Sequence, residues 1–283
     1  MAQVLKGMEV ANGMKERLIA ENADLIAKGV TPCLAVVRVG ERQDDLAYER
    51  GALKRFEGLG IAVKVSVFSE DIGQADFETE FKKINEDSTV HGILLFRPLP
   101  KSLDENAILK IIDPEKDMDC MCDTNIAKVF AGDESGYAPC TPEGVVELLK
   151  HFEVPLKGSK VVIVGRSMVV GKPLAMLLLK ENATVTICHT RTADLAAECK
   201  AANILIAAAG KAKMITAEHV KEGTVVIDVG INVDEEGNLC GDVDFEAVEP
   251  LASMITPVPG GVGSVTTSIL AMHTLKAAAK TLG

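Results

Sequence analysis

A glycine turn in the second half of the chain carries the clearest chemical signal. Residues 160–173 read KVVIVGRSMVVGKP, a β-branched run that stops at Gly165 and is followed by a predicted helix starting at Pro173. Such a run is typical of a parallel strand buried on both faces, and the unpaired N–H groups of the next helix favour a phosphate. The pattern departs from the usual glycine-rich fingerprint because Ser167 replaces its second glycine and Gly171 comes late. The turn predicts a nucleotide site, with an ordinary strand-to-helix turn as the alternative.

Three other groups have suitable chemistry but ambiguous positions. Asp119, in the acidic segment PEKDMDCMCD, can accept charge-assisted hydrogen bonds, although an acid in such a loop is ordinarily solvated. Tyr48 can stack on a flat ligand, whereas most tyrosines at helical spacing pack against neighbours. The glycine pair at 260–261 permits close backbone approach, but a Gly-Gly turn also occurs without a ligand. Residue type alone assigns none of them to a site.

Composition describes a folded, acidic, globular protein. The 283 residues are 47% apolar, which is enough for one large or two ordinary α/β domains. The 30 basic and 41 acidic side chains give a net charge of −11, and the basic residues cluster no further than in pairs. A nucleic-acid or anionic-membrane partner is therefore not expected.

The cysteines indicate a reducing compartment. Their number, 7, is odd and several lie in apolar runs, which favours reduced core thiols and a cytoplasmic location. Cys120 and Cys122 are the closest pair, but C-x-C without a second pair of ligands makes a poor zinc site, so no metal is expected. With no apolar stretch of about 18 residues and no signal-peptide core, neither export nor membrane anchoring is expected.

Periodicity predicts an α/β fold. Strands are expected over 33–39, 61–68, 92–96, 161–164, 184–188, 204–208 and 225–229, and helices over 8–28, 44–59, 74–85, 143–151, 173–179, 193–199 and 268–279. Strands that alternate with helices imply parallel sheets, and the second half reads as a Rossmann-like doubly wound sheet. Residues 113–141 have little periodicity and are interpreted as a linker that carries functional loops.

The chain resembles the 5,10-methylenetetrahydrofolate dehydrogenase/cyclohydrolase family over essentially its whole length. The resemblance is carried, in this order, by VVRVG, RPLP, PEKDMD, PCTPEG, VVIVGRSMVVGKP, ATVTICH, VVIDVGIN and TPVPGGVG. Family members oxidise methylenetetrahydrofolate with NADP or NAD and then hydrolyse the methenyl product to 10-formyltetrahydrofolate. The resemblance implies a folate-binding catalytic domain over 1–141 and 265–283, a Rossmann-like NADP-binding domain over 142–264, a cleft between them, and a homodimer.

The resemblance also implies site residues. The folate candidates are Tyr48, Phe96, Pro98, Leu99, Asp119, Pro259, Gly260 and Gly261, with Tyr48 and Asp119 as the catalytic candidates. The cofactor candidates are Gly165, Arg166, Ser167, Val170, Gly171, His189, Thr190, Arg191, Ala209, Gly210, Ile231 and Val262. Asp119 is expected to bind pterin N–H groups and His189 to line the adenosine side. Ser167 and the N–H groups of residues 169–171 are expected to meet the pyrophosphate.

The expected cofactor is NADP in preference to NAD. An NAD site places an acid about 20 residues after the glycine turn, at the end of the second strand. Here that strand is followed by His189, Thr190 and Arg191. Arg166, together with Thr190 and Arg191, can instead hold a 2′-phosphate, in line with the family's NADP-preferring members. The alternative is that both arginines are solvated surface groups.

Two family positions in the folate half differ in this chain. The resemblance places a lysine four residues after the tyrosine, on the same helical face, but Ala52 occupies that position after Tyr48. Lys54 lies about 240° round the helix from the tyrosine. Phe96 occupies the position of the family's glutamine, and Asp45 that of a helical serine.

These differences separate the two activities. Hydride transfer needs proximity and moves no proton, so a lysine is dispensable for it. Hydrolysis of the methenyl cation needs an attacking water and proton transfer, and therefore an acid–base group. We expect a dehydrogenase whose cyclohydrolase activity is lost or weak. The alternatives are the full bifunctional enzyme, with Lys54 or Arg97 serving after a shifted alignment, and a non-catalytic folate- or nucleotide-binding protein.

Overall fold

The computed structural model describes residues 2–234 and 236–282, and the chain forms two compact units. The six-stranded unit comprises Met1–Gly13 and Thr141–Thr266, and the three-stranded unit comprises Met14–Cys140 and Thr267–Gly283. The domain division implied by the resemblance, with 1–141 in the folate domain, stays a prediction, and in the structure the first 13 residues group with the six-stranded unit. The reason is that β1 (Gln3–Val4) pairs in parallel with β11 (Met254–Ile255). Met1 and Gly283, the outer ends of the predicted domain, lie outside the described residues.

The sheet of the six-stranded unit is parallel throughout. Its order is β1-β11-β8-β7-β5-β6, with β5 (Lys160–Val164), β6 (Thr184–Cys188), β7 (Ile204–Ala207) and β8 (Val225–Asp228) as the longer strands. The β-branched residues of β5 are all buried, because strands pair with β5 on both sides. The prediction of a fully buried parallel strand is confirmed.

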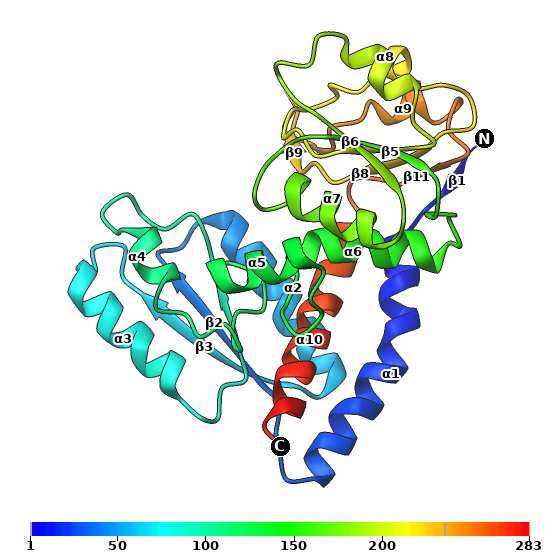
Figure 1. Cartoon of the computed structure of the whole chain (residues 1–283). Coiled ribbons are helices and arrows are strands. Elements are labelled where there is room, and N and C mark those ends of the chain that lie inside the picture. Colours follow the sequence, from blue (N-terminus) through cyan, green and yellow to red (C-terminus); the bar gives the residue numbers. More distant parts are fainter. Residues whose placement is uncertain (1, 235, 283) are drawn as a thin grey trace. The chain divides into compact units, whose positions relative to one another are not determined.

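Helices cover both faces of this sheet (Figure 1). They are α7 (Gly171–Lys180), α8 (Leu195–Lys200) and α9 (Phe245–Val248), with the 3-10 turn η1 (Ala217–His219). Cys199 of α8 and Val248 of α9 pack in one buried cluster with Val162 of β5. On the opposite face, α7 buries Leu174 and Leu178 (Figure 1). Successive residues of a strand point to opposite faces, so β5 serves both layers, and the doubly wound α/β architecture is confirmed.

The three-stranded unit contains a second parallel sheet, in the order β3-β2-β4. Its strands are β2 (Cys33–Val39), β3 (Ala62–Phe68) and β4 (Gly92–Leu95). The remaining helices of the chain are α1 (Gly7–Ala27), α2 (Gln43–Leu59), α3 (Gln74–Glu86), α4 (Glu105–Leu109), α5 (Asp123–Ala131), α6 (Cys140–His151) and α10 (Gly263–Lys280). α3 lies over one face of the sheet (Figure 1). Its Phe77 and Phe81 pack with Val37 in one buried cluster. β3 lies at the edge and exposes Val65 and Val67.

The segment 113–141 is more ordered than predicted, because α5 lies inside it. The sequence gives no capping residue at the start of α5, because the N-cap residue, Cys122, makes no side-chain cap hydrogen bond. Instead the buried carboxylate of Asp117 accepts the N–H groups of Met121 and Cys122, at 2.8 and 2.9 Å. The interpretation of this segment as a linker is therefore wrong.

The shortest elements were also not predicted. These are β1, β11, α4, α9, η1, β9 (Asn232–Val233) and β10 (Leu239–Cys240). A two-residue strand, or a helix of at most five residues, contains too few positions for a hydrophobic period to show.

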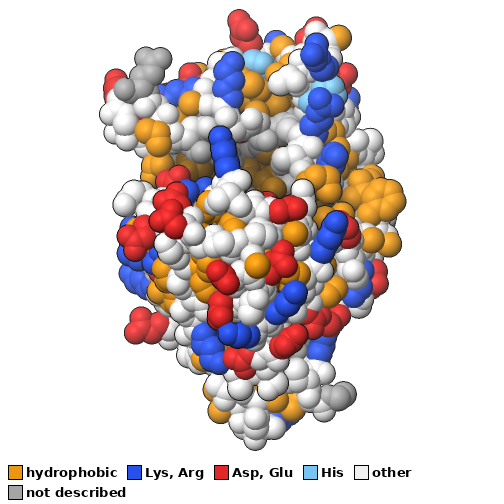
Figure 2. All heavy atoms as spheres, turned by 90° about the vertical axis from the view of Figure 1, so that its left-hand side faces the viewer, with side chains coloured by type: hydrophobic (Ala, Val, Ile, Leu, Met, Phe, Trp, Pro, Cys, Tyr) orange, Lys and Arg blue, Asp and Glu red, His pale blue; other side chains and the backbone are white. Residues whose placement is uncertain are grey.

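The surface and the cysteines complete the description of the fold. On the face that Figure 2 shows, acidic and basic side chains intermingle over the molecule. All seven cysteines are buried and none is bridged to another. Among the described residues, no helix combines the length and the apolar character needed to cross a membrane.

Candidate functional site

The predicted cofactor residues follow the carboxyl ends of parallel strands. Gly165 follows β5, His189 follows β6, Ala209 and Gly210 follow β7, and Ile231 follows β8. The chain passes from β5 to β6 on one side and then crosses to β7 on the other, so a topological switch point lies between β5 and β7. In open α/β sheets the ligand crevice forms at such a point. The fold brings these candidates to one edge of the sheet.

Positions 165 and 171 require glycine because other backbone segments pass very close to them. Gly165 has a φ of +139°, and a Cβ placed on it would lie 2.1 Å from the carbonyl oxygen of Ala208. A Cβ on Gly171 would lie 2.1 Å from the carbonyl oxygen of Gly165. A side chain at either position would therefore push the turn away from β7 or from the start of α7. The two glycines keep the turn tight and leave its backbone accessible, which suits a phosphate at the start of a helix.

The helix after this turn begins earlier than predicted. α7 starts at Gly171 with Val170 as its N-cap, so Pro173 is the third residue of the helix and its predicted place as the first is wrong. Its missing N–H is tolerated there because the first N–H groups of a helix have no partner within it. The Ser167 hydroxyl accepts the N–H of Val170 at 3.1 Å. That N–H, predicted to meet a pyrophosphate, already has a partner in the turn.

The end of β6 forms a self-contained turn. The N–H of His189 donates to the Thr192 hydroxyl at 2.8 Å, and the N–H of Arg191 donates to His189 Nδ1 at 3.0 Å. His189 Nδ1 is therefore an acceptor, and in the neutral ring the proton lies on Nε2. Thr190 and Arg191 are both exposed. The next acid, Asp194, accepts an N–H at 2.9 Å in the first turn of α8, as its N-cap.

Two buried carboxylates missed by the sequence analysis hold the turn after β7. Asp242 accepts the N–H groups of Ala209, Gly210 and Lys211 at 2.5, 3.0 and 2.9 Å. Asp228, the last residue of β8, accepts the N–H of Asp242 at 3.0 Å. Burial raises the pKa of Asp228 to about 6, and the nearby Asp242 adds to the rise. The available signal for Asp228 was a single acid within the apolar run VVIDV, where a buried charge is costly unless it is hydrogen-bonded.

The PGGVG turn belongs to the six-stranded unit and packs against the start of α1. The N–H of Gly7 donates to the carbonyl of Gly260 at 2.9 Å. A Cβ on Gly7 would lie 2.0 Å from the carbonyl oxygen of Gly261. Pro259 and Gly260 are exposed, whereas Val262 is buried. Packing against Gly7 therefore explains part of the glycine pattern. Pro259 and Gly260 are exposed and accessible to a ligand.

Tyr48 and Ala52 lie one turn apart on α2, in the three-stranded unit. The Tyr48 ring meets the ring of Phe96, which follows β4, with centroids 5.8 Å apart and planes at 81°. Ala52 is 1% exposed, whereas Lys54 is exposed to solvent. Because α2 is continuous, Lys54 lies on a different face of the helix from Tyr48 and Ala52.

Arginine–carboxylate pairs surround this part of α2. Arg42 donates to both oxygens of Asp45, at 2.9 and 2.8 Å, and also to the carbonyl of Arg97 at 3.0 Å. Arg97 Nη1 lies 3.6 Å from Glu105 Oε1, and the second oxygen of Glu105 accepts the N–H of Leu99 at 2.9 Å. Asp45, at the serine position of the family, is therefore paired with Arg42. Of the RPLP candidates, Pro98 is exposed and Leu99 is buried.

Asp119 is partly buried beside the start of α6. Its Oδ1 accepts the N–H of Cys140 at 2.7 Å. Burial raises the pKa of Asp119, and the hydrogen bond from Cys140 opposes that rise. Asp117, two residues earlier, is fully buried and accepts the N–H groups of Met121 and Cys122, just before α5. The two acids of the KDMD segment therefore have separate surroundings, and Asp119 is the more accessible of the two.

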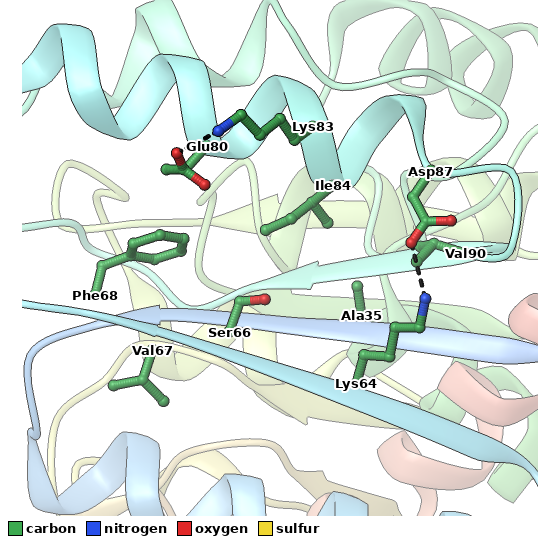
Figure 3. Close-up of a pocket in the computed structure, with 10 residues that line it drawn as sticks. All are labelled: Ala35, Lys64, Ser66, Val67, Phe68, Glu80, Lys83, Ile84, Asp87 and Val90. Carbon is green, nitrogen blue, oxygen red and sulfur yellow. Dashed lines mark hydrogen bonds and ion pairs between the residues drawn. The ribbon is translucent and has the colours of Figure 1, made fainter.

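A hollow of about 410 Å³ lies between β3 and α3, and no predicted folate residue lines it. Phe68 lies on its wall, and ion pairs join the charged side chains around it (Figure 3). Lys64 Nζ is 2.8 Å from Asp87 Oδ2, and Lys83 Nζ is 2.7 Å from Glu80 Oε1. Within the two described ranges, no group of His, Cys, Asp and Glu side chains is arranged to hold a metal ion.

Comparison with known proteins assigns the family. Residues 5–119 match the catalytic domain of tetrahydrofolate dehydrogenase/cyclohydrolase, and residues 139–282 match its NAD(P)-binding domain. The bifunctional protein FolD of Clostridioides difficile is 59% identical over 275 residues, which cover 97% of this chain and 96% of that protein.

Solved structures agree with this result over both units. The bifunctional FolD methylenetetrahydrofolate dehydrogenase/cyclohydrolase of Campylobacter jejuni has a TM-score of 0.96 at 40% identity and covers 99% of this chain and 100% of its own. The Trypanosoma brucei enzyme, solved with NADP and an inhibitor, has a TM-score of 0.93 at 36% identity, over 99% of this chain and 98% of its own. The chain therefore belongs to the tetrahydrofolate dehydrogenase/cyclohydrolase family of enzymes.

Proposed function

We propose that this chain oxidises 5,10-methylenetetrahydrofolate to 5,10-methenyltetrahydrofolate, with NADP as the hydride acceptor. NADP, when bound, supplies the nicotinamide that takes the hydride from the methylene carbon. The chain's own task is to hold the folate in reach and to tolerate the cation that results, without moving a proton. The observation that carries the proposal is the tight turn between Gly165 and Gly171 at the switch point of a parallel sheet.

The six-stranded unit is the proposed NADP-binding unit. Arg166 follows Gly165 in the tight turn, and Thr190 and Arg191 are exposed after β6. The first acid after β6, Asp194, is engaged as the cap of α8, which leaves the 2′ position of the adenosine ribose to the arginines. The solved T. brucei relative carries NADP, which supports the choice. The other proposed cofactor contacts are Ser167, Val170, Gly171, His189, Ala209, Gly210, Ile231 and Val262.

The three-stranded unit is the proposed folate-binding unit. Asp119 offers a carboxylate whose orientation is set by the N–H of Cys140, and charge-assisted bonds to pterin N–H groups suit it. Tyr48 offers a ring whose edge already contacts Phe96, so its position is restricted. The remaining proposed folate contacts of this unit are Pro98 and Leu99, and the candidates Pro259, Gly260 and Gly261 belong to the six-stranded unit.

We further propose that hydrolysis of the methenyl product is weak or absent. Attack by water gives a tetrahedral carbinolamine whose collapse requires proton transfer. Ala52 carries only a methyl group, and Phe96 has no hydrogen-bonding side chain, at the positions where the family resemblance predicts lysine and glutamine. The Arg97 side chain carries hydrogen-bond donors only and pairs with Glu105, so it offers no acceptor for a proton from water. Lys54 lies on another face of α2.

The full bifunctional enzyme is the second candidate function. It is favoured by the name of the C. difficile relative, a bifunctional protein at 59% identity. Under this candidate the chain converts the methenyl product to 10-formyltetrahydrofolate, and a group other than a lysine at position 52 transfers the proton.

A paired assay of the purified chain separates these candidates. Formation of reduced nicotinamide is followed with methylenetetrahydrofolate and either NADP or NAD, and loss of methenyltetrahydrofolate is followed against buffer without protein. We expect reduction of NADP and methenyl loss close to the buffer rate. Methenyl loss well above that rate establishes the bifunctional candidate. Reduction of neither dinucleotide favours a non-catalytic binding protein.

We also propose that the chain forms a homodimer and acts in the cytoplasm. Within the described part of the chain, β3 pairs with a strand on one side only, and Val65 and Val67 are exposed on it. An apolar edge strand is a template for pairing with another chain, and a second copy is the proposed partner. The cytoplasmic location rests on the unbridged cysteines, which suit a reducing compartment.

A further inference from the structure

His273, on α10, reaches the segment that carries Asp119. It is 2% exposed, and its Nδ1 lies 2.8 Å from the carbonyl oxygen of Met118. A carbonyl oxygen can only accept a hydrogen bond, so Nδ1 must carry the proton and donate it. The ring of Tyr137 packs against the histidine ring from another side, with centroids 5.4 Å apart. The orientation of His273 is therefore fixed by a hydrogen bond and by packing.

Cys140 acts on the same segment from the start of α6. Its Sγ donates to the carbonyl of Met118 at 3.3 Å, and its N–H donates to Asp119 Oδ1 at 2.7 Å. Two buried donors thus converge on one carbonyl, and a third bond holds the carboxylate of the next residue. Asp119 is restrained both at its own side chain and through the backbone that precedes it.

The backbone directly after Asp119 needs such restraint. Cys120 has a φ of +54°, in the left-handed region that residues other than glycine seldom adopt. Conformations of this kind persist only where the surrounding contacts over-determine them. Loss of a bond to Met118 would let the segment relax, and the Asp119 carboxylate would move with it.

We propose that His273 is a positioning residue for the folate, which directs the Asp119 carboxylate toward the pterin through the Met118 carbonyl and does not itself touch the substrate. This inference rests on the proposed function, in which Asp119 binds the pterin. The role requires a hydrogen-bond donor at the δ position of the side chain and no exchange of a proton.

Two full-length variants test the requirement for a donor. His273→Asn keeps an N–H close to the δ position, whereas His273→Leu has a similar volume and no donor. Calorimetry measures the Kd of tetrahydrofolate, and the thermal unfolding midpoint of the same preparation serves as the folding control. We expect His273→Leu to weaken tetrahydrofolate binding about tenfold and His273→Asn by less than about threefold. No effect of leucine, or equal effects of both variants, overturns the inference.

A double-mutant cycle separates positioning from packing. In an Asp119→Ala background, His273→Leu should weaken tetrahydrofolate binding no further, because the carboxylate it directs is gone. Additive effects overturn the inference. Should His273→Leu fail to fold, Cys140→Ala takes its place in the cycle, with a loss of about threefold expected.

The cycle also distinguishes failure of this inference from failure of the proposed function. If Asp119→Ala alone leaves tetrahydrofolate affinity unchanged, the proposed folate role of Asp119 fails and the inference falls with it. If Asp119→Ala weakens binding and His273→Leu does not, only the inference fails.

Discussion

The ring edge of Tyr48 meets the ring of Phe96, with centroids 5.8 Å apart and planes at 81°. Tyr48 comes from α2 and Phe96 follows β4, so the contact joins two elements that are neighbours only in the fold. An edge-to-face pair adds about 0.5–1.5 kcal/mol to packing and supplies no proton. The three-stranded unit therefore places an aromatic contact at position 96, where the family resemblance predicts a polar group.

Under the proposal that hydrolysis is weak, placing lysine at position 52 and glutamine at position 96 should raise its rate. The double variant Ala52→Lys and Phe96→Gln is expected to consume methenyltetrahydrofolate at least about 100-fold faster than the parent chain, because general acid–base catalysis contributes factors of this size. Loss of methenyl absorbance measures the effect, and retained dehydrogenase activity shows that the variant has folded. Lys54→Ala, a change on another face of α2, is the matched control and should alter neither activity. A double variant that oxidises normally and still fails to hydrolyse contradicts the assignment.

Arg166 should determine the preference for NADP. We expect Arg166→Ala to raise the KM for NADP by about 10- to 100-fold, since a charge-assisted hydrogen bond contributes about 1.5–3 kcal/mol. The KM for NAD should change by less than about threefold, because NAD lacks the 2′-phosphate. Initial rates with both dinucleotides provide the measurement. An unchanged KM for NADP would show that Arg166 is a solvated surface residue.

Asp228 should make stability depend on pH in a definite direction. Burial raises its pKa from 3.8 to about 6, so between these values the folded chain binds more protons than the unfolded chain. The contribution of Asp228 to stability is complete below its pKa in the unfolded chain, 3.8, and is lost as pH rises through its pKa in the folded chain, about 6. In urea unfolding, the free energy of unfolding of the parent chain should fall by up to about 3 kcal/mol relative to that of Asp228→Asn between pH about 4 and about 7. Parallel stability curves for the two chains contradict this assignment.

The edge of β3 should control assembly. Val67 is 49% exposed on this edge strand, and Val67→Lys places a charge where a second copy would pair. Light scattering after gel filtration should give twice the 30.0 kDa chain mass for the parent and the single mass for the variant. Val233→Lys, at a position 63% exposed in the six-stranded unit, is the control and should remain dimeric. A parent chain that is monomeric, or a Val67→Lys variant that stays dimeric, rules out this edge as the interface.

The sequence predicts the strands that build both sheets because their signals are local. Cys33–Val39 and Thr184–Cys188 are strands at the predicted residues, and the β-branched run before Gly165 is the buried strand β5. The two glycines of the turn can also be recognised in the sequence. At each of them a Cβ would lie 2.1 Å from a backbone carbonyl oxygen, so only glycine fits. The spacing between Tyr48 and Ala52 is likewise a property of one helix, and it could be read before the fold was known.

The sequence by itself therefore determined the α/β class, the turn after β5, and the absence of a lysine one turn after Tyr48. Only the tertiary structure decided that β1 joins the six-stranded sheet, that Asp117 binds the N–H groups just before α5, and that Asp242 holds the turn after β7. It also brought His273 to the carbonyl of Met118, across 155 residues of chain. The physical reason is the same in each case. A period of two or 3.6 residues reports which face of an element is buried, but a hydrogen bond between distant segments exists only after packing brings donor and acceptor together.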